Sequence, residues 1–468
     1  MPLSFEVLSD SCDPLALCRS THGALLESAR LTKKTGRYSI VAFDPFLILD
    51  SRGGRTSLKE GRALRYSKKN PFEILEALLR RFARPAMTPE EPPFLGGAIG
   101  IVGYDAKGWI EPRFQDDKKQ NTDFPELYFQ FFNEGFVVDH ACQRTWVFAE
   151  NPRRLGTLLK EFARAKRVSK KSSPFIGMPP VAASLTRATF VDSVRRIKRY
   201  IKAGDIFQAN FSQRFDFSFR EDVKRAYARL RTLNPSAFFG ILNGGDFQIL
   251  SGSPERLVSL ERGKIQTRPI AGTRARGKNK KEDKQVSLDL ILNEKERAEH
   301  LMLVDLERND MGRVSAYGSV GVSEFMTMED YSHVKHIVSN VEGVLRKNLG
   351  AVDVLKAFFP GGTITGAPKI RSMEIIDELE PTARGPYTGS MGYLSFSGNM
   401  DMNILIRSLL IRKETASLQV GAGIVADSDP EKEYDETLYK AAAIFSALFG
   451  ERRARRFLQS RGVAARIS

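Results

Sequence analysis

Two predicted helices each carry a pair of glutamates three residues apart, a spacing that places both carboxylates of a pair on one helix face. The four glutamates are Glu296, Glu299, Glu433 and Glu436. The first pair precedes an apolar run at 301–306, and the second follows Asp429-Pro430, residue types typical of a helix start. Mg²⁺ binds one or two carboxylates and leaves positions for water and an anionic substrate, so two such faces could hold it. The spacing fits equally well two helix faces that carry ion pairs.

Other groups that could do chemistry lie at the ends of apolar runs or in glycine-rich turns. Glu255 follows an apolar run at a strand-to-loop edge, although single glutamates are usually surface charges. The Gly-Ala-Gly stretch 421–423 could let backbone N–H groups approach a carboxylate. The segment 361–369 has the glycine spacing of a phosphate-binding loop, but Ala-Pro replaces the required Lys-Ser/Thr, so nucleotide binding is excluded. His336 is one of only five histidines, and a lone histidine is more often structural than catalytic.

Hydrophobic periodicity predicts the elements that position these groups. Apolar residues spaced as on one helix face over 190–201 predict a helix that ends at Gly204. Alternating apolar and polar residues over 207–217 predict a strand with Gln208 on its polar face. Pro368 begins a further helix. Before residue 163 the chain shows short β-like runs separated by Gly and Pro.

The charge of the chain is concentrated in two short segments. The 468 residues carry 72 basic and 56 acidic side chains, a net charge of +16. Five Lys/Arg and no acid in 163–171, and six Arg with one Glu in 451–468, give +5 each. Neither segment interleaves basic residues with aromatics, so we interpret both as solvated rather than as nucleic-acid sites. The three cysteines have no metal-ligand spacing, and we find neither a secretory signal nor a membrane span, so we expect a soluble cytoplasmic protein.

Several motifs in combination resemble those of the chorismate-utilising enzymes, the family that includes the first components of anthranilate synthase and aminodeoxychorismate synthase. They are Pro269-Ile-Ala-Gly-Thr273-Arg, the Glu299 helix, the His336 motif, Gly-Ala-Pro-Lys369 and Asp-Glu436-Thr. The resemblance covers nearly the whole chain and is densest over 190–448. It implies an α+β fold: a large β-sandwich of two sheets flanked by helices, with the active site between sheets and helices.

The resemblance also implies a division of the chain and a role for each candidate residue. We expect an N-terminal portion of the fold (1–162), a basic linker (163–187), a chorismate-binding catalytic region (188–450) and a basic tail (451–468). Glu299 and Glu436 would bind Mg²⁺, with Glu296 and Glu433 beside them or completing the coordination, and Glu255 would protonate the departing 4-hydroxyl. The remaining residues expected to line the ring or hold its carboxylates are Gln208, Ala271, Gly272, Thr273, His336, Tyr393, Arg407, Gly421, Gly423 and Lys440.

The resemblance further suggests the nucleophile and a partner. Family members that add water carry a lysine base where this chain has Gln208, so we expect ammonia as the nucleophile. The chain shows no glutaminase nucleophile-elbow cysteine, which implies a separate glutamine amidotransferase subunit as the source of ammonia.

The identity of the product is open between two aminated compounds. Residues 359–366 and Gln208-Ala-Asn210 resemble the aminodeoxychorismate synthases. Ala271 stands where some of those enzymes carry a lysine that attacks chorismate covalently, so that route is excluded here. We expect 4-amino-4-deoxychorismate for folate synthesis, with anthranilate for tryptophan synthesis as the alternative. A basic nucleic-acid-binding protein is the alternative from another class.

Overall fold

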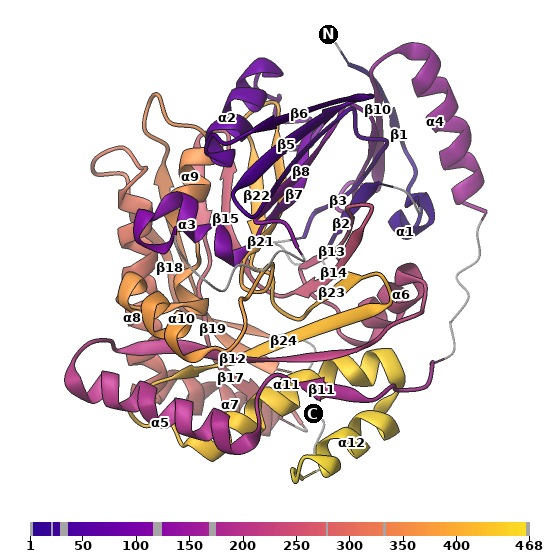
Figure 1. Cartoon of the computed structure of the whole chain (residues 1–468). Helices are drawn as coiled ribbons and strands as arrows, with labels where there is room; N and C mark the ends of the chain where they lie inside the picture. Colours follow the sequence, from indigo (N-terminus) through magenta and orange to yellow (C-terminus); the bar gives the residue numbers. More distant parts are fainter. Residues whose placement is uncertain are drawn as a thin grey trace.

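Strands from the first 150 residues pair with strands from beyond residue 230 in both sheets of the computed structural model (Figure 1). The structure describes residues 3–19, 22–28, 36–115, 124–167, 175–277, 279–330 and 334–464. Because the N-terminal strands lie inside both sheets, residues 1–162 do not form a separate domain and belong to the same fold as the rest of the chain.

Within the described ranges, the first sheet is antiparallel and has 12 strands. Its order is β1 (Ser4–Leu8), β10 (Arg144–Ala149), β9 (Gly135–Asp139), β3 (Tyr38–Phe43), β2 (Gly23–Glu27), β13 (Phe238–Asn243), β14 (Phe247–Ser253), β23 (Ser408–Arg412), β24 (Thr415–Ile424), β12 (Gln208–Ser218) and β11 (Val181–Ala183), with β20 (Gly366–Ala367) also pairing with β12.

The second sheet is also antiparallel, and the part of the chain that the structure describes contributes 12 strands to it. Its order is β17 (Ile270–Ala275), β19 (Val334–Val344), β16 (Lys264–Thr267), β15 (Arg256–Glu261), β22 (Met400–Asn403), β21 (Ser390–Ser395), β7 (Gly97–Val102), β8 (Leu127–Phe132), β4 (Leu47–Arg52), β5 (Arg55–Glu60) and β6 (Ala63–Ser67), with β18 (Gly321–Asp330) pairing with β19.

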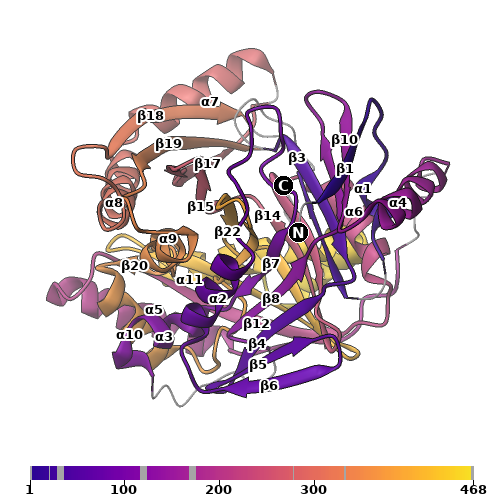
Figure 2. The ribbon, with the colours of Figure 1, turned by 90° about the horizontal axis from the view of Figure 1, so that it is seen from above.

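Helices cover the outer faces of the two sheets. They are α1 (Pro14–Leu17), α2 (Pro71–Arg81), α3 (Lys107–Ile110), α4 (Pro152–Ala165), α5 (Arg187–Ala203), α6 (Val223–Leu233), α7 (Lys280–Leu292), α8 (Glu294–Gly312), α9 (Ala351–Phe358), α10 (Lys369–Leu379), α11 (Pro430–Phe449) and α12 (Glu451–Ser460). In Figure 1, α5, α11 and α12 lie below β12 and β24. Figure 2 shows α7, α8, β18 and β19 gathered at one end of the molecule, away from α4 and β1.

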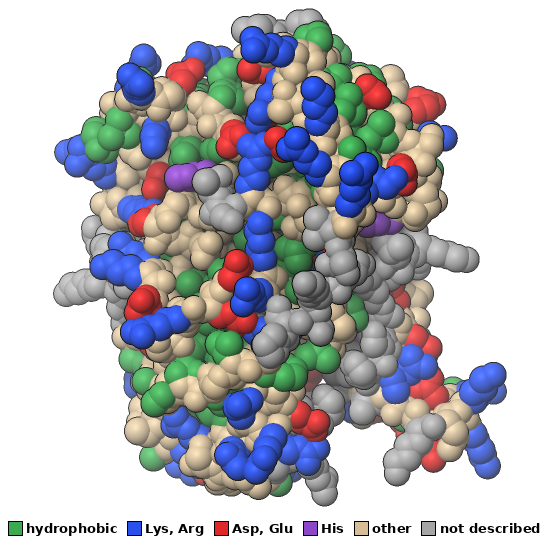
Figure 3. Space-filling model, turned by 90° about the vertical axis from the view of Figure 1, so that its right-hand side faces the viewer, with side chains coloured by type: hydrophobic (Ala, Val, Ile, Leu, Met, Phe, Trp, Pro, Cys, Tyr) green, Lys and Arg blue, Asp and Glu red, His purple; other side chains and the backbone are tan. Residues whose placement is uncertain are grey.

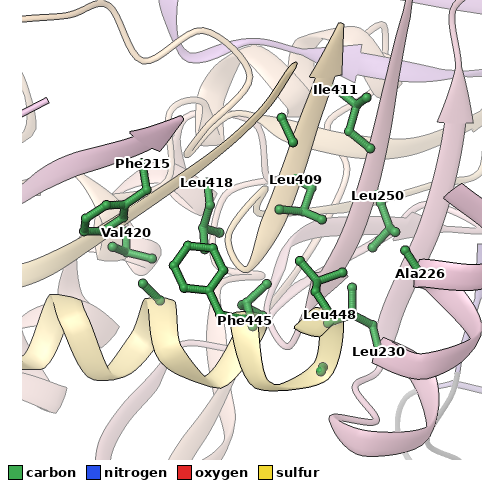
Figure 4. Close-up of a cluster of buried hydrophobic side chains, with 14 of the residues drawn as sticks. Phe215, Ala226, Leu230, Leu250, Leu409, Ile411, Leu418, Val420, Phe445 and Leu448 are labelled. Carbon is green, nitrogen blue, oxygen red and sulfur yellow. The ribbon is translucent and has the colours of Figure 1, made fainter. Parts of the chain in front are cut away.

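Three apolar clusters join these layers. One contains side chains from β2, β3 and β9 of the first sheet and from β7, β8 and β21 of the second, so the two sheets pack face to face. A second joins the other face of the first sheet to α4, α5, α6, α11 and α12. Figure 4 shows part of it, where Phe445 and Leu448 of α11 pack against Leu409 and Leu418. The third joins the second sheet to α2, α8 and α9. The expected α+β sandwich of two sheets flanked by helices is confirmed.

The local signals of the helix starts and stops are confirmed as well. The side chain of Asp429 accepts hydrogen bonds from two backbone N–H groups at the start of α11, and Pro430 is the first helical residue. Helix α5 ends at Ala203, and Gly204 adopts the left-handed conformation that commonly terminates helices, with φ = 84°.

Two segments interpreted as solvated contain regular structure instead. Of the expected linker 163–187, residues up to Ala165 complete α4, and residues 181–183 form β11 at the edge of the first sheet; residues 168–174 are outside the described part. The expected basic tail contains α12, whose Ala454, Phe457 and Leu458 are buried. Net charge could not reveal this, because the arginines occupy one side of a helix whose other side is apolar.

The surface carries side chains of both charges. On the face shown in Figure 3, lysine and arginine side chains are scattered among acidic and apolar ones. Over the part of the chain that the structure describes, no helix combines the length and the apolar character needed to cross a bilayer.

Replacing Phe457 by alanine tests whether α12 is part of the core. Its ring centroid lies 5.6 Å from that of Phe215 and 5.0 Å from that of Phe445. We expect F457A to lower the free energy of unfolding by about 3 kcal/mol, because it removes a buried aromatic side chain. Urea unfolding measures this, and R456A, at an exposed position of the same helix, is the matched control. Equal stability of F457A and the wild type would mean that α12 is a solvated tail.

Candidate active site

The segment 359–369 connects the first sheet to α8 and lies at the centre of the candidate site. Its short strand β20 pairs with the start of β12, where Gln208 is opposite Ala367. The backbone N–H of Asn210 also donates to the carbonyl oxygen of Thr365 at 2.9 Å. Just before β20, the 3₁₀ turn Gly362–Ile364 contacts α8. The polar end of β12 and one side of α8 are thereby held against the same turn.

Glu255 lies between β14 and β15 and is buried, with 9% of its surface exposed. Burial raises the pKa of its carboxyl to about 7, against a smaller lowering by the Thr363 side chain and the positive charge of Arg407. The backbone of Glu255 is hydrogen-bonded at both ends: its carbonyl accepts from Ile404 N–H at 3.0 Å, and its N–H donates to the Ser253 hydroxyl at 3.3 Å. A carboxyl with this pKa carries a proton near neutral pH and can donate it.

Arg407 adopts a backbone conformation that residues other than glycine rarely take. Its φ is 51°, in the left-handed region. Its carbonyl oxygen accepts a hydrogen bond from Gly252 N–H at 3.2 Å, just before Glu255 in the chain. Arg407 also contributes a positive charge to the surroundings of Glu255.

A second group of candidate residues gathers where β12, β24 and α11 meet. The ammonium group of Lys440 contacts the carboxylate of Glu436 at 2.8 Å and donates to the carbonyl oxygen of Gly421, also at 2.8 Å. A Cβ atom at Gly423 would lie 2.7 Å from the Gln208 side chain, so only glycine leaves room for that amide. Asn210 belongs to the same group, because its side-chain oxygen would lie 2.5 Å from a Cβ atom at Gly421.

Two amide oxygens in this group are buried without a hydrogen-bond partner among the described residues: Oε1 of Gln208 and Oδ1 of Asn210. Buried polar atoms in proteins nearly always have a partner. Both residues lie at the start of β12, next to the Gly421–Gly423 segment of β24.

A third group lies on β17 and β19. Gly272 has φ = 62° at an irregularity in the β17–β19 register, and its carbonyl oxygen accepts from Nδ1 of His336 at 3.0 Å. Thr273 and His336 are directly opposite each other in the backbone ladder of β17 and β19. Glu296 lies beside Gly272 and forms an ion pair with Arg274 at 2.9 Å.

The remaining expected residues are less tightly connected to these groups. Ala271 precedes the irregularity in β17 and is partly buried. Tyr393 lies in the core between the sheets, with its ring centroid 5.4 Å from that of Phe94, and burial raises its pKa. Glu299 and Glu433 are partly buried on α8 and α11, and both have interactions with neighbouring groups.

The carboxylates expected to bind a metal ion are not grouped into a preformed site in the described part of the chain. Among the described residues, no group of three or more His, Cys, Asp or Glu side chains is arranged to hold one. The four expected glutamates therefore do not form a complete metal-binding site by themselves. Glu296 forms an ion pair with Arg274, and Glu436 forms one with Lys440. Mg²⁺ needs only one or two protein carboxylates, because water and an anionic substrate can supply its other ligands.

The structure adds one residue that the sequence analysis missed. Glu307 on α8 is 5% exposed, and burial together with the negative charges of Asp310 and Glu255 raises its pKa to about 8. It follows Glu296 by eleven residues, about three helical turns, so both lie on one face. That spacing was visible in the sequence, but its significance depends on which face the protein buries.

Comparisons with known proteins agree on one enzyme family. Residues 26–446 match the model of a family described as chorismate binding enzyme. The chain is 42% identical to aminodeoxychorismate synthase component 1 of Bacillus subtilis (strain 168), over 96% of each chain. It is 39% identical to anthranilate synthase component 1 of Acetivibrio thermocellus, over 96% of this chain and 95% of that one. The crystal structure of anthranilate synthase component I from Streptococcus pneumoniae TIGR4 superposes with a TM-score of 0.77 at 34% identity, covering 89% and 93% of the two chains.

The raised pKa of Glu255 predicts a pH dependence of stability. The folded protein holds this proton up to about pH 7, whereas the unfolded chain releases it near the ordinary value of 4.5. Stability conferred by the protonated group is therefore present below pH 4.5 and is lost as the pH rises to about 7. Relative to wild type, we expect E255Q to be more stable at pH 8 than at pH 4.5 by about 3 kcal/mol.

Urea unfolding of both proteins across this pH range measures the difference. E90Q, at an exposed position, should follow the wild-type profile. Parallel curves for E255Q and wild type would show that Glu255 is ionised in the folded protein at neutral pH.

Proposed function

The chain belongs to the family of chorismate-binding enzymes, and on that premise we propose that it converts chorismate and ammonia to 4-amino-4-deoxychorismate. The observation that carries this proposal is the buried, proton-holding carboxyl of Glu255 next to the positive charge of Arg407. Replacing a hydroxyl by an amine requires the hydroxyl to leave as water, and Glu255 would supply that proton. The similarity to the Bacillus subtilis enzyme favours the same reaction.

Charged and polar groups around the site match the other needs of the reaction. Chorismate is a dianion, and Arg407 and Lys440 would bind its carboxylates together with the backbone of Gly421–Gly423. The unpartnered oxygens of Gln208 and Asn210 would accept hydrogen bonds from ammonia, which is a donor.

Mg²⁺ is part of this proposal. Glu299 on α8 and Glu436 on α11 would hold it, and the bound ion would neutralise the ring carboxylate of the substrate. The ion pair of Glu436 with Lys440 keeps its carboxylate beside β24, on the same side as Gly421.

The alternative product is anthranilate. The relative from Acetivibrio thermocellus, an anthranilate synthase component 1, is nearly as similar as the aminodeoxychorismate synthase. Ala271 also removes the side chain needed for a covalent intermediate, so ammonia must attack directly for either product.

A product assay separates the two reactions. The chain is incubated with chorismate, Mg²⁺ and an ammonium salt, and products are resolved by chromatography. We expect 4-amino-4-deoxychorismate, which gives 4-aminobenzoate only after addition of the corresponding lyase. Fluorescent anthranilate appearing without a lyase would identify the alternative reaction.

A second prediction concerns the source of ammonia. We propose that a glutamine amidotransferase subunit supplies it in the cell, so the isolated chain should use ammonium salts and show no turnover with glutamine. The nitrogen source is varied at constant chorismate and Mg²⁺. Turnover of the isolated chain with glutamine would remove the need for the partner.

The variant E436Q tests the proposed metal ligand. We expect chorismate turnover to fall at least about 100-fold and Mg²⁺ binding, measured by calorimetry in the presence of chorismate, to weaken, because one carboxylate ligand is lost. The matched control is E451Q, which alters an exposed glutamate in a similar i,i+4 pair with Arg455 on α12. Near-normal turnover and Mg²⁺ binding in E436Q would remove Glu436 from the ligand set.

A further inference from the structure

One edge of β12 has a gap between its two neighbouring strands in the described part of the chain. On this edge β20 pairs with residues 208–209, and β11 pairs with residues 215–217. Backbone groups between these stretches need other hydrogen bonds, because a buried N–H or C=O group without a partner is costly. Two side chains that follow α10, those of Glu380 and Arg384, supply several of them.

Glu380 and Arg384 form a buried ion pair beside this gap. Their exposed fractions are 3% and 2%, and the guanidinium contacts both carboxylate oxygens, at 2.7 and 2.9 Å. Oε1 of Glu380 also accepts from the backbone N–H of Ser212 at 2.9 Å and from its hydroxyl at 2.7 Å. The carboxylate therefore takes the place of a strand carbonyl opposite Ser212.

The guanidinium of Arg384 joins two further segments. It donates to the carbonyl oxygen of Asn210 at 2.6 Å and to that of Ile364 at 3.0 Å. The hydroxyl of Thr388 accepts a third hydrogen bond at 3.1 Å. Together with the two bonds to Glu380, these contacts give each of the five guanidinium N–H groups an acceptor.

The two joined segments carry different parts of the candidate site. Asn210 lies at the start of β12 beside Gln208, whereas Ile364 ends the 3₁₀ turn that packs next to Glu255. A Cβ atom at Gly361 would lie 3.2 Å from the side chain of Ile404, whose N–H donates to the Glu255 carbonyl. Arg384 is thus hydrogen-bonded both to the strand that carries the amides and to the turn that lies against the acid.

We propose that Arg384 is a positioning residue: anchored by Glu380, it fixes the start of β12 and the turn 362–364 at one separation. This inference rests on the proposed function, in which Glu255 protonates the departing hydroxyl while Gln208 and Asn210 hold ammonia. A buried ion pair is weak evidence of a role in stability, because apolar residues of similar volume often replace one without loss. Apolar side chains cannot bind the carbonyl oxygens of Asn210 and Ile364, whereas a guanidinium fork binds both.

The variant R384K tests this role in turnover. Lysine keeps the positive charge but presents its donors from one point instead of a planar fork, so it cannot serve all five acceptors. We expect kcat to fall at least about ten-fold, since small displacements of the reacting groups are costly. KM for chorismate should stay within about two-fold, because Arg407 and Lys440, the proposed carboxylate ligands, are unchanged. Wild-type kcat in folded R384K would overturn the proposal.

The variant R229K is the matched control. Arg229 and Glu221 also form a buried ion pair, with side chains 6% and 5% exposed, and the guanidinium contacts both carboxylate oxygens. R229K should lower the urea midpoint, as expected for a lost buried fork, and keep kcat within about two-fold of wild type. An equal loss of kcat in R229K and R384K would reduce the effect to general stability and overturn the proposal.

A second variant, E380D, disturbs the anchor more gently. It keeps the charge and withdraws the carboxylate by one methylene group from Arg384 and Ser212. We expect the same pattern on a smaller scale, with kcat lower by about five-fold and KM unchanged. This variant also provides the test if R384K does not fold, and wild-type kcat in E380D would count against the proposal in the same way.

Hydrogen exchange followed by mass spectrometry tests the joint without substrate. In R384K we expect faster exchange in peptides covering 208–213 and 361–366, because Asn210 N–H donates to the Thr365 carbonyl and depends on the separation of the two segments. Peptides covering 238–243, in β13, should exchange as in wild type.

Exchange that rises equally in all three regions, or stays unchanged in the first two, would overturn the proposal. Faster exchange confined to those two regions, in a protein whose wild type consumes no chorismate, would contradict the proposed function and leave the role of Arg384 in joining the segments intact.

Discussion

Exclusion of water around the turn at 359–369 is the constraint on which the site depends. Three carboxyl groups, those of Glu255, Glu307 and Asp310, are buried next to this turn with one lysine, Lys369. Ionising all three there would place charge in a poorly solvated interior, a cost that the neighbouring cations offset only in part, so protons remain bound at pH values where exposed carboxylates have lost them. The fold thereby produces an acid at neutral pH from ordinary glutamates, without any unusual residue.

That exclusion of water requires the whole chain. β14, which leads to Glu255, pairs with β13 and β23, and β13 in turn pairs with the N-terminal strand β2. β15, which follows Glu255, pairs with β22, and β7 from the first hundred residues continues that sheet through β21. The N-terminal portion contributes no expected catalytic residue, yet it completes both sheets that enclose the acid.

The sequence predicted those parts of the molecule that depend on local patterns. Alternation over 207–217 identified β12, and Asp429-Pro430 identified the start of α11, because a strand face and a helix cap are each determined by a few neighbouring residues. The sequence did not predict the helix α12 or the burial of Glu307, because segments distant in the chain form their surroundings. Phe457 of α12 packs on Phe215, and Glu307 faces Gly362. The site residues themselves came from the resemblance to a family rather than from spacing, which could not separate a metal site from two faces with ion pairs.

The chemistry proposed for the site imposes opposing demands on pH. Ammonia is a nucleophile only when it has lost the extra proton of ammonium, which favours alkaline conditions, whereas the departing hydroxyl needs an acid that still holds its proton. An exposed glutamate would satisfy the second demand only at acidic pH, where nearly all of the nitrogen is protonated. Burial of Glu255 and Glu307 moves the loss of their protons to about pH 7 and 8, so the two requirements overlap near neutrality. A pH range in which free ammonia and a protonated glutamate coexist would allow formation of either aminated product, since both reactions require ammonia to enter and the hydroxyl to leave.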